Sequence, residues 1–73
     1  MTKNKPVAAT AAHITAINQM AANDATEEIE NHGVRLTHEQ ADEIDATGHA
    51  WLRQRLGLTC TTDDMGVTYS LPV

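Results

Sequence analysis

The sequence predicts a small, mainly helical α+β domain in which a helix, a short strand, a second helix or helix pair, and a C-terminal β-hairpin follow one another. Apolar residues near the N-terminus recur at three- and four-residue steps, which is the spacing of one helical face. A helix-capping pattern stands at residues 37–40. Apolar and polar residues then alternate on both sides of a short loop within residues 58–71, as two antiparallel strands require.

The first helix is predicted to begin at about residue 7 or 10 and to run into the twenties. Its apolar face comprises Val7, Ala11, Ile14, Ile17, Ala21 and Ala25. Asp24 and Glu27 form a capping pattern, and the glutamates that follow suit the start of a helix better than its end. We therefore predict a break near Asp24 and a short second helix to Asn31, with Gly33 just past its end. One continuous helix is the alternative.

Residues 33–37 alternate and predict a short strand, with Val34 and Leu36 on its apolar side. Thr37 and Gln40 then form a capping box, so a helix is expected to start at His38. On a single helix its apolar face would contain Ala41, Ile44, Gly48, Trp51, Leu52 and Leu56. Asp45 would fall inside that face, and residues 45–48 suit a turn. Two short helices at residues 38–44 and 49–56 are therefore the alternative to one.

The C-terminal segment predicts a β-hairpin. Leu58, Cys60 and Thr62 alternate with threonines, and Val67, Tyr69 and Leu71 alternate after a loop at residues 63–66. Threonine, valine and tyrosine favour strands, and Gly66 suits the loop. Pro72 is expected to end the pairing.

The length of 73 residues predicts a single domain at residues 7–73, preceded by a disordered lead-in at residues 1–6. The core is expected to be small, because 11 of the hydrophobic residues are alanine and there is no phenylalanine. A core of this kind rarely supplies more than about 3–5 kcal/mol, so a homodimer or a bound partner is expected to add stability. Trp51 is predicted to be the largest core residue, with an exposed interface anchor as the alternative. Tyr69 is expected to cover the hairpin with its hydroxyl in water.

Cys60 is the only cysteine, so no disulfide can form within the chain. A small secreted domain would usually carry several disulfides, and this one is therefore predicted to be cytoplasmic. The apolar run after Lys5 is too short for a signal peptide or a membrane span.

The sequence contains none of the common catalytic or phosphate-binding motifs, which predicts a non-enzymatic protein with no cofactor and no catalytic residues. A metal site would need His32, His38, His49 and Cys60 to converge. Their spacing matches no zinc-binding pattern, so no metal is expected.

Eight of the ten acidic residues lie within residues 24–45, where Arg35 is the only basic residue. Such a stretch favours a partner with a basic surface and repels a nucleic-acid backbone. We expect a small acidic regulatory protein that binds another protein, plausibly as an inhibitor of the compact kind that phages and mobile elements encode. The predicted contact patch comprises Glu27, Glu28, Glu30, Glu39, Asp42, Glu43 and Asp45. An ordinary solvated acidic face is the alternative.

Over residues 7–71 the predicted element order also resembles that of winged helix-turn-helix domains. This resemblance implies a DNA-binding regulator in which residues 49–56 form the recognition helix. The residues that would contact DNA are His49, Arg53, Gln54 and Arg55. Binding to nucleic acid is the less favoured hypothesis, because Asp63 and Asp64 stand at the tip of the wing and the chain has five lysines and arginines in total.

Overall fold

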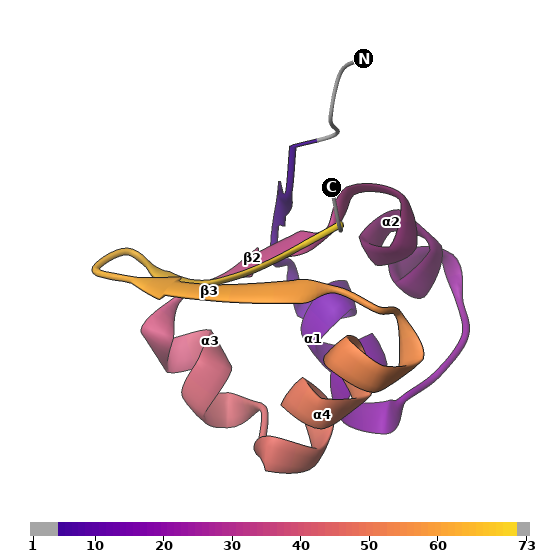
Figure 1. Ribbon diagram of the computed structural model, residues 1–73. Coiled ribbons are helices and arrows are strands. Elements are labelled where there is room, and N and C mark those ends of the chain that lie inside the picture. Colours follow the sequence, from indigo (N-terminus) through magenta and orange to yellow (C-terminus); the bar gives the residue numbers. More distant parts are fainter. Residues whose placement is uncertain (1–4, 72–73) are drawn as a thin grey trace.

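The computed structural model describes residues 5–71, which form four helices and a four-stranded sheet (Figure 1). The elements are β1 (Val7–Ala8), α1 (Ala11–Gln19), α2 (Asp24–His32), β2 (Val34–Leu36), α3 (His38–Glu43), α4 (Ala46–Arg55), β3 (Thr59–Asp63) and β4 (Gly66–Ser70). The predicted α+β class is confirmed. Residues 1–4 of the predicted lead-in and Pro72 lie outside the described residues. No helix in the described part of the chain is both long and apolar enough to cross a bilayer.

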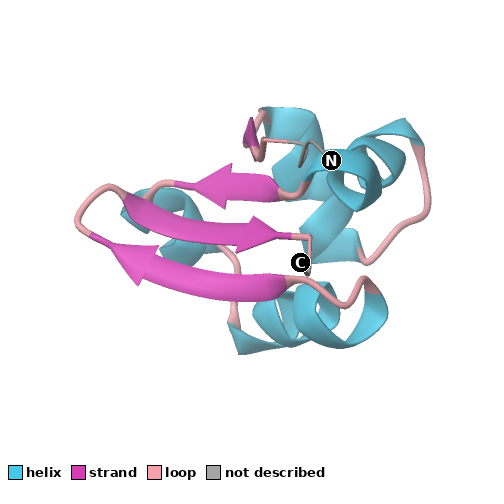
Figure 2. Ribbon diagram, turned by 45° about the horizontal axis from the view of Figure 1, so that its top comes forward, coloured by secondary structure: helices cyan, strands magenta, loops and turns pink. Residues whose placement is uncertain are grey.

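The sheet has the strand order β1-β2-β4-β3, with β1 parallel to β2 and the other pairs antiparallel. Residues 34–36 pair with the hairpin, as the winged helix-turn-helix resemblance implies: Val34 lies opposite Tyr69 and Leu36 opposite Val67. These four side chains face the helices and are buried. The other face carries no helix and is seen from above in Figure 2. Arg35 and Thr68 lie opposite each other on that face.

The predicted break in the first helical segment is confirmed. Met20 ends α1 with a left-handed φ of 53°, and its N–H donates to the carbonyls of Ala16 and Ile17. Asn23 rather than Asp24 caps α2, because the Asn23 side chain accepts from the N–H groups of Ala25 and Thr26. Gly33 caps the other end.

Residue 7, the earlier of the two predicted starts of the first helix, is wrong. Val7 and Ala8 form β1 beside β2, and Ala9 N–H donates to the Arg35 carbonyl at 2.9 Å. Thr10 then caps α1 together with His13: His13 N–H donates to Thr10 Oγ1, and Thr10 N–H donates to His13 Nδ1. The helix begins only at Ala11, because pairing with a distant strand fixes the residues before it in an extended conformation.

The second helical segment consists of two helices, with the predicted capping box at Thr37 and Gln40 at its start. Ile44 is extended, and Asp45 caps α4 by accepting from Gly48 N–H at 3.0 Å. The alternative with two helices is therefore correct, although α4 begins at Ala46 and includes part of the predicted turn.

The core lies between the sheet and the helices. Its buried hydrophobic residues are Ala16, Ile17, Ile29, Val34, Leu36, Ala41, Ile44, Leu52, Leu58, Val67 and Tyr69. Tyr69 is 1% exposed and is the largest fully buried side chain, so the prediction that its hydroxyl reaches water is wrong. Trp51 is only partly buried at the margin of the core. Tyr69 takes the central position because β4 lies between two other strands.

Candidate partner-binding surface

The seven carboxylates of the predicted acidic patch are all exposed, and the structure divides them between different elements. Glu27, Glu28 and Glu30 lie on α2, which packs against α1. Glu39, Asp42 and Glu43 lie on α3, which packs against β2 and β4. Figure 1 shows α2 and α3 at opposite ends of the molecule, with β2 between them. The two acidic groups are therefore not brought together into one surface.

Two of these carboxylates have structural contacts. Glu28 Oε1 lies 2.6 Å from Nε2 of the buried His13, and Asp45 caps α4. Carboxylates in such contacts are less available to a partner. The exposed carboxylates of α3, by contrast, do not make such structural contacts. They are Glu39, Asp42 and Glu43.

The hairpin tip adds two acidic residues to the α3 end of the molecule. Nε2 of His38, in the first turn of α3, lies 3.0 Å from the carbonyl oxygen of Asp63. This contact holds Asp63 and Asp64 next to α3, where Figure 1 shows the hairpin extending over the helix. Met65, between Asp64 and Gly66, is 71% exposed. We call Glu39, Asp42, Glu43, Asp63 and Asp64 the α3–hairpin acidic surface.

Asp63 and Asp64 lie outside the predicted acidic patch, although the order of the predicted strands offers a signal for their position. If residues 34–36 pair with the second strand of the hairpin, the hairpin loop must lie near residue 37, where α3 begins. The winged helix-turn-helix resemblance implies a pairing with the hairpin without specifying its strand, and choosing the second strand would have indicated that the loop aspartates approach the acidic helix.

The predicted DNA-contacting residues lie on α4, but they do not share one environment. Arg53, Gln54 and Arg55 are exposed in the last turns. The His49 ring is partly buried with its centroid 5.9 Å from that of Tyr69, and its Nε2 atom is buried without a hydrogen-bond partner. His49 thus faces the sheet, whereas the other three residues face solvent.

The residues considered for metal binding do not converge. Within residues 5–71 no three histidine, cysteine or acidic side chains lie close enough to hold an ion. His38 contacts the hairpin, His49 packs on Tyr69, and Cys60 is exposed on β3.

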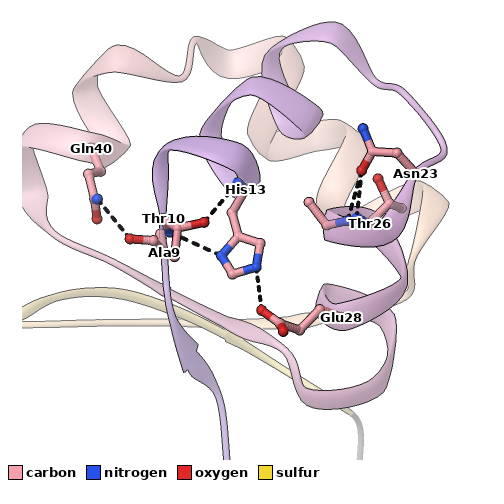
Figure 3. Close-up of polar contacts among 8 residues, drawn as sticks. Ala9, Thr10, His13, Asn23, Thr26, Glu28 and Gln40 are labelled. Atoms are coloured by element: carbon pink, nitrogen blue, oxygen red, sulfur yellow. Dashed lines mark hydrogen bonds and ion pairs between the residues drawn. The ribbon is translucent and has the colours of Figure 1, made fainter.

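His13 and Glu28 have the composition of a catalytic pair but not the free atoms that catalysis requires. Figure 3 shows His13 between Thr10 and Glu28, with Nδ1 accepting from Thr10 N–H at 3.0 Å and Nε2 beside the carboxylate. Because Nδ1 accepts, Nε2 carries the proton and donates to Glu28. Both ring nitrogens therefore form contacts within the fold, and the His13–Glu28 contact connects α1 to α2.

Comparisons with protein-family models, with curated proteins and with solved structures found no match. We therefore infer function from the charge, exposure and topology of the described residues.

Proposed function

We propose that this chain is a small regulatory or inhibitory protein that binds a protein partner with a basic surface through the α3–hairpin acidic surface. The proposal rests on one observation: the His38–Asp63 contact joins the acidic helix α3 to the acidic hairpin tip. Five exposed carboxylates are thereby gathered at one end of a domain with a formal net charge of −5. Such a field attracts basic surfaces and accelerates their association.

The positions of the basic residues support the same surface. Arg35 lies on the open face of the sheet, and Arg53 and Arg55 lie in the last turn of α4. In Figure 1 that turn leads into the start of β3, at the end of the hairpin away from its tip. The α3–hairpin acidic surface therefore contains no lysine or arginine, whereas the four carboxylates of α2 lie at the end of the molecule that also carries Arg53 and Arg55.

Exposed Met65 at the hairpin tip supplies an apolar group beside the acidic residues. Its flexible thioether suits an adaptable contact. Charged groups around such a contact contribute mainly to association rate and specificity, while the buried apolar area contributes affinity. A protein with a reduced thiol at Cys60 suits the cytoplasm, where we expect the partner to be found.

The test is a capture experiment with two matched charge-reversal variants. Glu39→Lys with Glu43→Lys reverses two carboxylates of the α3–hairpin surface. Glu27→Lys with Glu30→Lys reverses two exposed carboxylates of α2 and changes the net charge equally. Each tagged protein is incubated with nuclease-treated native lysate at low and moderate salt, and captured proteins are quantified by mass spectrometry.

We expect a nuclease-resistant partner to be captured by the wild type and by the α2 variant, and lost from the α3 variant and at higher salt. Equal loss in both variants would show that only the net charge matters. Retention by the α3 variant would reject this surface as the contact. Circular dichroism of each variant verifies that the fold is intact.

DNA binding is a second candidate, favoured by the topology. β2 pairs with β4 of the hairpin, and two residues join α3 to α4, as the winged helix-turn-helix hypothesis requires. The acidic residues of α3 and the hairpin tip oppose it, because phosphate contacts supply most of the affinity for DNA.

Fluorescence anisotropy with a mixed-sequence duplex at low salt separates the two candidates. A DNA-binding protein would lose affinity on Arg53→Ala with Arg55→Ala, and would gain affinity on Glu39→Lys with Glu43→Lys because repulsion is reduced. If the wild type shows no affinity for the duplex, DNA binding is rejected.

A further inference from the structure

β3 is an edge strand that only β4 holds in place. Each of its five residues, Thr59–Asp63, is exposed. Cys60 and Thr62 lie opposite Tyr69 and Val67 and so belong to the side of the sheet that faces the helices. Their exposure shows that the helical layer does not extend beneath β3.

The free edge of β3 has few of the features that usually prevent strand pairing. Proline, bulges and charged side chains commonly protect such edges, and between Thr59 and Asp63 the one such feature is Asp63, at the end of the strand. The two-residue loop makes Asp63 and Gly66 the closing pair of the hairpin. Because hydrogen-bonded pairs alternate in an antiparallel ladder, the main-chain groups of Cys60 and Thr62 point outward.

The geometry points to a homodimer in which β3 pairs antiparallel with β3 of a second copy of this chain, with Thr61 at the two-fold axis. This register pairs all five residues of each strand and sets Cys60 opposite Thr62 of the second copy. The outward N–H and C=O groups of Cys60 and Thr62 are then satisfied in both copies. Two four-stranded sheets become one continuous sheet.

Charge complementarity favours a second copy as the occupant of this edge. Thr59, Cys60, Thr61 and Thr62 carry no formal charge, so two acidic chains meet where repulsion is small. In this register Asp63, the last residue of β3, lies opposite Thr59 of the other copy, so Asp64 in the turn follows next to Leu58, which precedes that copy's β3. Arg53 lies beside Leu58, because both line the same shallow surface concavity at the end of α4. The two-fold axis therefore creates two equivalent Arg53–Asp64 contacts between the copies.

Sedimentation at increasing protein concentration, in reducing buffer, tests the dimer and its contacts. We expect the wild type to pass from 7.9 kDa to twice that mass. Arg53→Glu or Asp64→Lys alone should weaken the dimer about tenfold, because each replaces two attractions with two repulsions. The double variant should recover most of the wild-type affinity. A wild type that stays monomeric at about millimolar concentration, or a dimer unaffected by either reversal, would overturn the proposal.

Cross-linking tests the register. Thr61→Cys combined with Cys60→Ser places one thiol per chain at the two-fold axis, in a non-hydrogen-bonded pair whose Cα atoms would be about 4.5 Å apart. With oxidised glutathione this variant should form a covalent dimer much faster than the wild type, whose Cys60 lies opposite Thr62. Equal or slower cross-linking of the variant would exclude this register. The readout is independent of the acidic-surface proposal, because it involves no other partner.

Discussion

Met20 ends α1 in a left-handed backbone conformation that residues with a Cβ atom rarely adopt. Its φ is 53°, and its side chain is 40% exposed. The conformation costs an L-residue about 1–2 kcal/mol, yet it lets the Met20 N–H reach the carbonyls of Ala16 and Ile17 and turns the chain toward α2. The end of α1 is therefore locally strained, and the strained conformation is the one that turns the chain toward α2.

Met20→Gly should therefore stabilise the domain. Relief of the left-handed strain exceeds the added entropy of the unfolded chain, and we expect a gain of about 0.5–1 kcal/mol. Urea denaturation followed by circular dichroism measures it. Met20→Ala is the control, since alanine keeps the Cβ and should give no gain. A loss of stability on Met20→Gly would show that the exposed methionine makes a contact that outweighs its strain.

Tyr69 illustrates how burial changes the chemistry of a residue. Burial raises its pKa from 10.0 to about 12, and the neighbouring Cys60 thiol acts in the same direction. Because the folded-state pKa lies above the unfolded value, this residue's contribution to stability is fully present below pH 10 and is lost as the pH rises toward 12.

The free energy of unfolding should fall between about pH 10 and pH 12 through Tyr69. Since the chain has one tyrosine, near-ultraviolet phenolate absorbance reports this residue alone. Tyr69→Phe keeps the buried ring and should remove that part of the pH dependence. A phenolate transition at the ordinary pKa of 10.0 would contradict the burial of the hydroxyl.

At the scale of elements, the first two helices are joined by polar contacts as well as by the core. His13 is 3% exposed and connects the start of α1 to Glu28 on α2. The Thr26 hydroxyl donates to the Ala21 carbonyl across the connection between the helices. Gln40 of α3 donates to the Ala9 carbonyl at 3.2 Å, which fixes α3 to the chain before α1 (Figure 3). These contacts hold short helices that would be marginal in isolation.

His13→Ala should destabilise the domain by about 2–4 kcal/mol, because it removes a buried ring and leaves the Thr10 N–H without its acceptor. Glu28→Gln should cost less than about 1 kcal/mol, since an amide oxygen still accepts from Nε2–H. Both are measured by urea denaturation. If Glu28→Gln destabilised the domain as much as His13→Ala does, the His13–Glu28 contact would require a charged pair rather than a neutral histidine.

For the molecule as a whole, the hairpin and β2 approach so closely that one added carbon atom would disturb the fold. A Cβ on Gly66 would lie 2.1 Å from the Leu36 carbonyl oxygen, and the φ of Gly66 is +142°. Gly57 also has a positive φ, +68°, but a Cβ there would meet no atom within 4 Å. A substitution at Gly57 therefore introduces backbone strain alone, whereas a substitution at Gly66 adds a collision with β2.

Gly57→Ala should cost about 1 kcal/mol, the penalty of a left-handed residue. Gly66→Ala should cost more than about 3 kcal/mol, a large part of the stability of a domain this size. Thermal and urea unfolding of both variants measure the difference. Similar costs for the two substitutions would show that the hairpin can move away from β2 freely.

The local features of this protein follow from its amino-acid sequence. The capping box at Thr37, the break before α2, and the alternation in the hairpin depend on contacts between residues close in the chain, and all three are present in the structure. The strand at residues 34–36 was predictable from its own alternation of apolar and polar residues, although distant strands pair with it.

The contacts between distant residues depend on the packing of the whole domain. Pairing with β2 makes Val7 part of a strand, and the central position of β4 buries Tyr69 more deeply than Trp51. The length of β2 separates the acidic residues of α2 from those of α3, while the hairpin register brings Asp63 to His38. Such contacts depend on strand order and on the packing of whole elements. The sequence around each residue does not indicate which distant side chain it will contact.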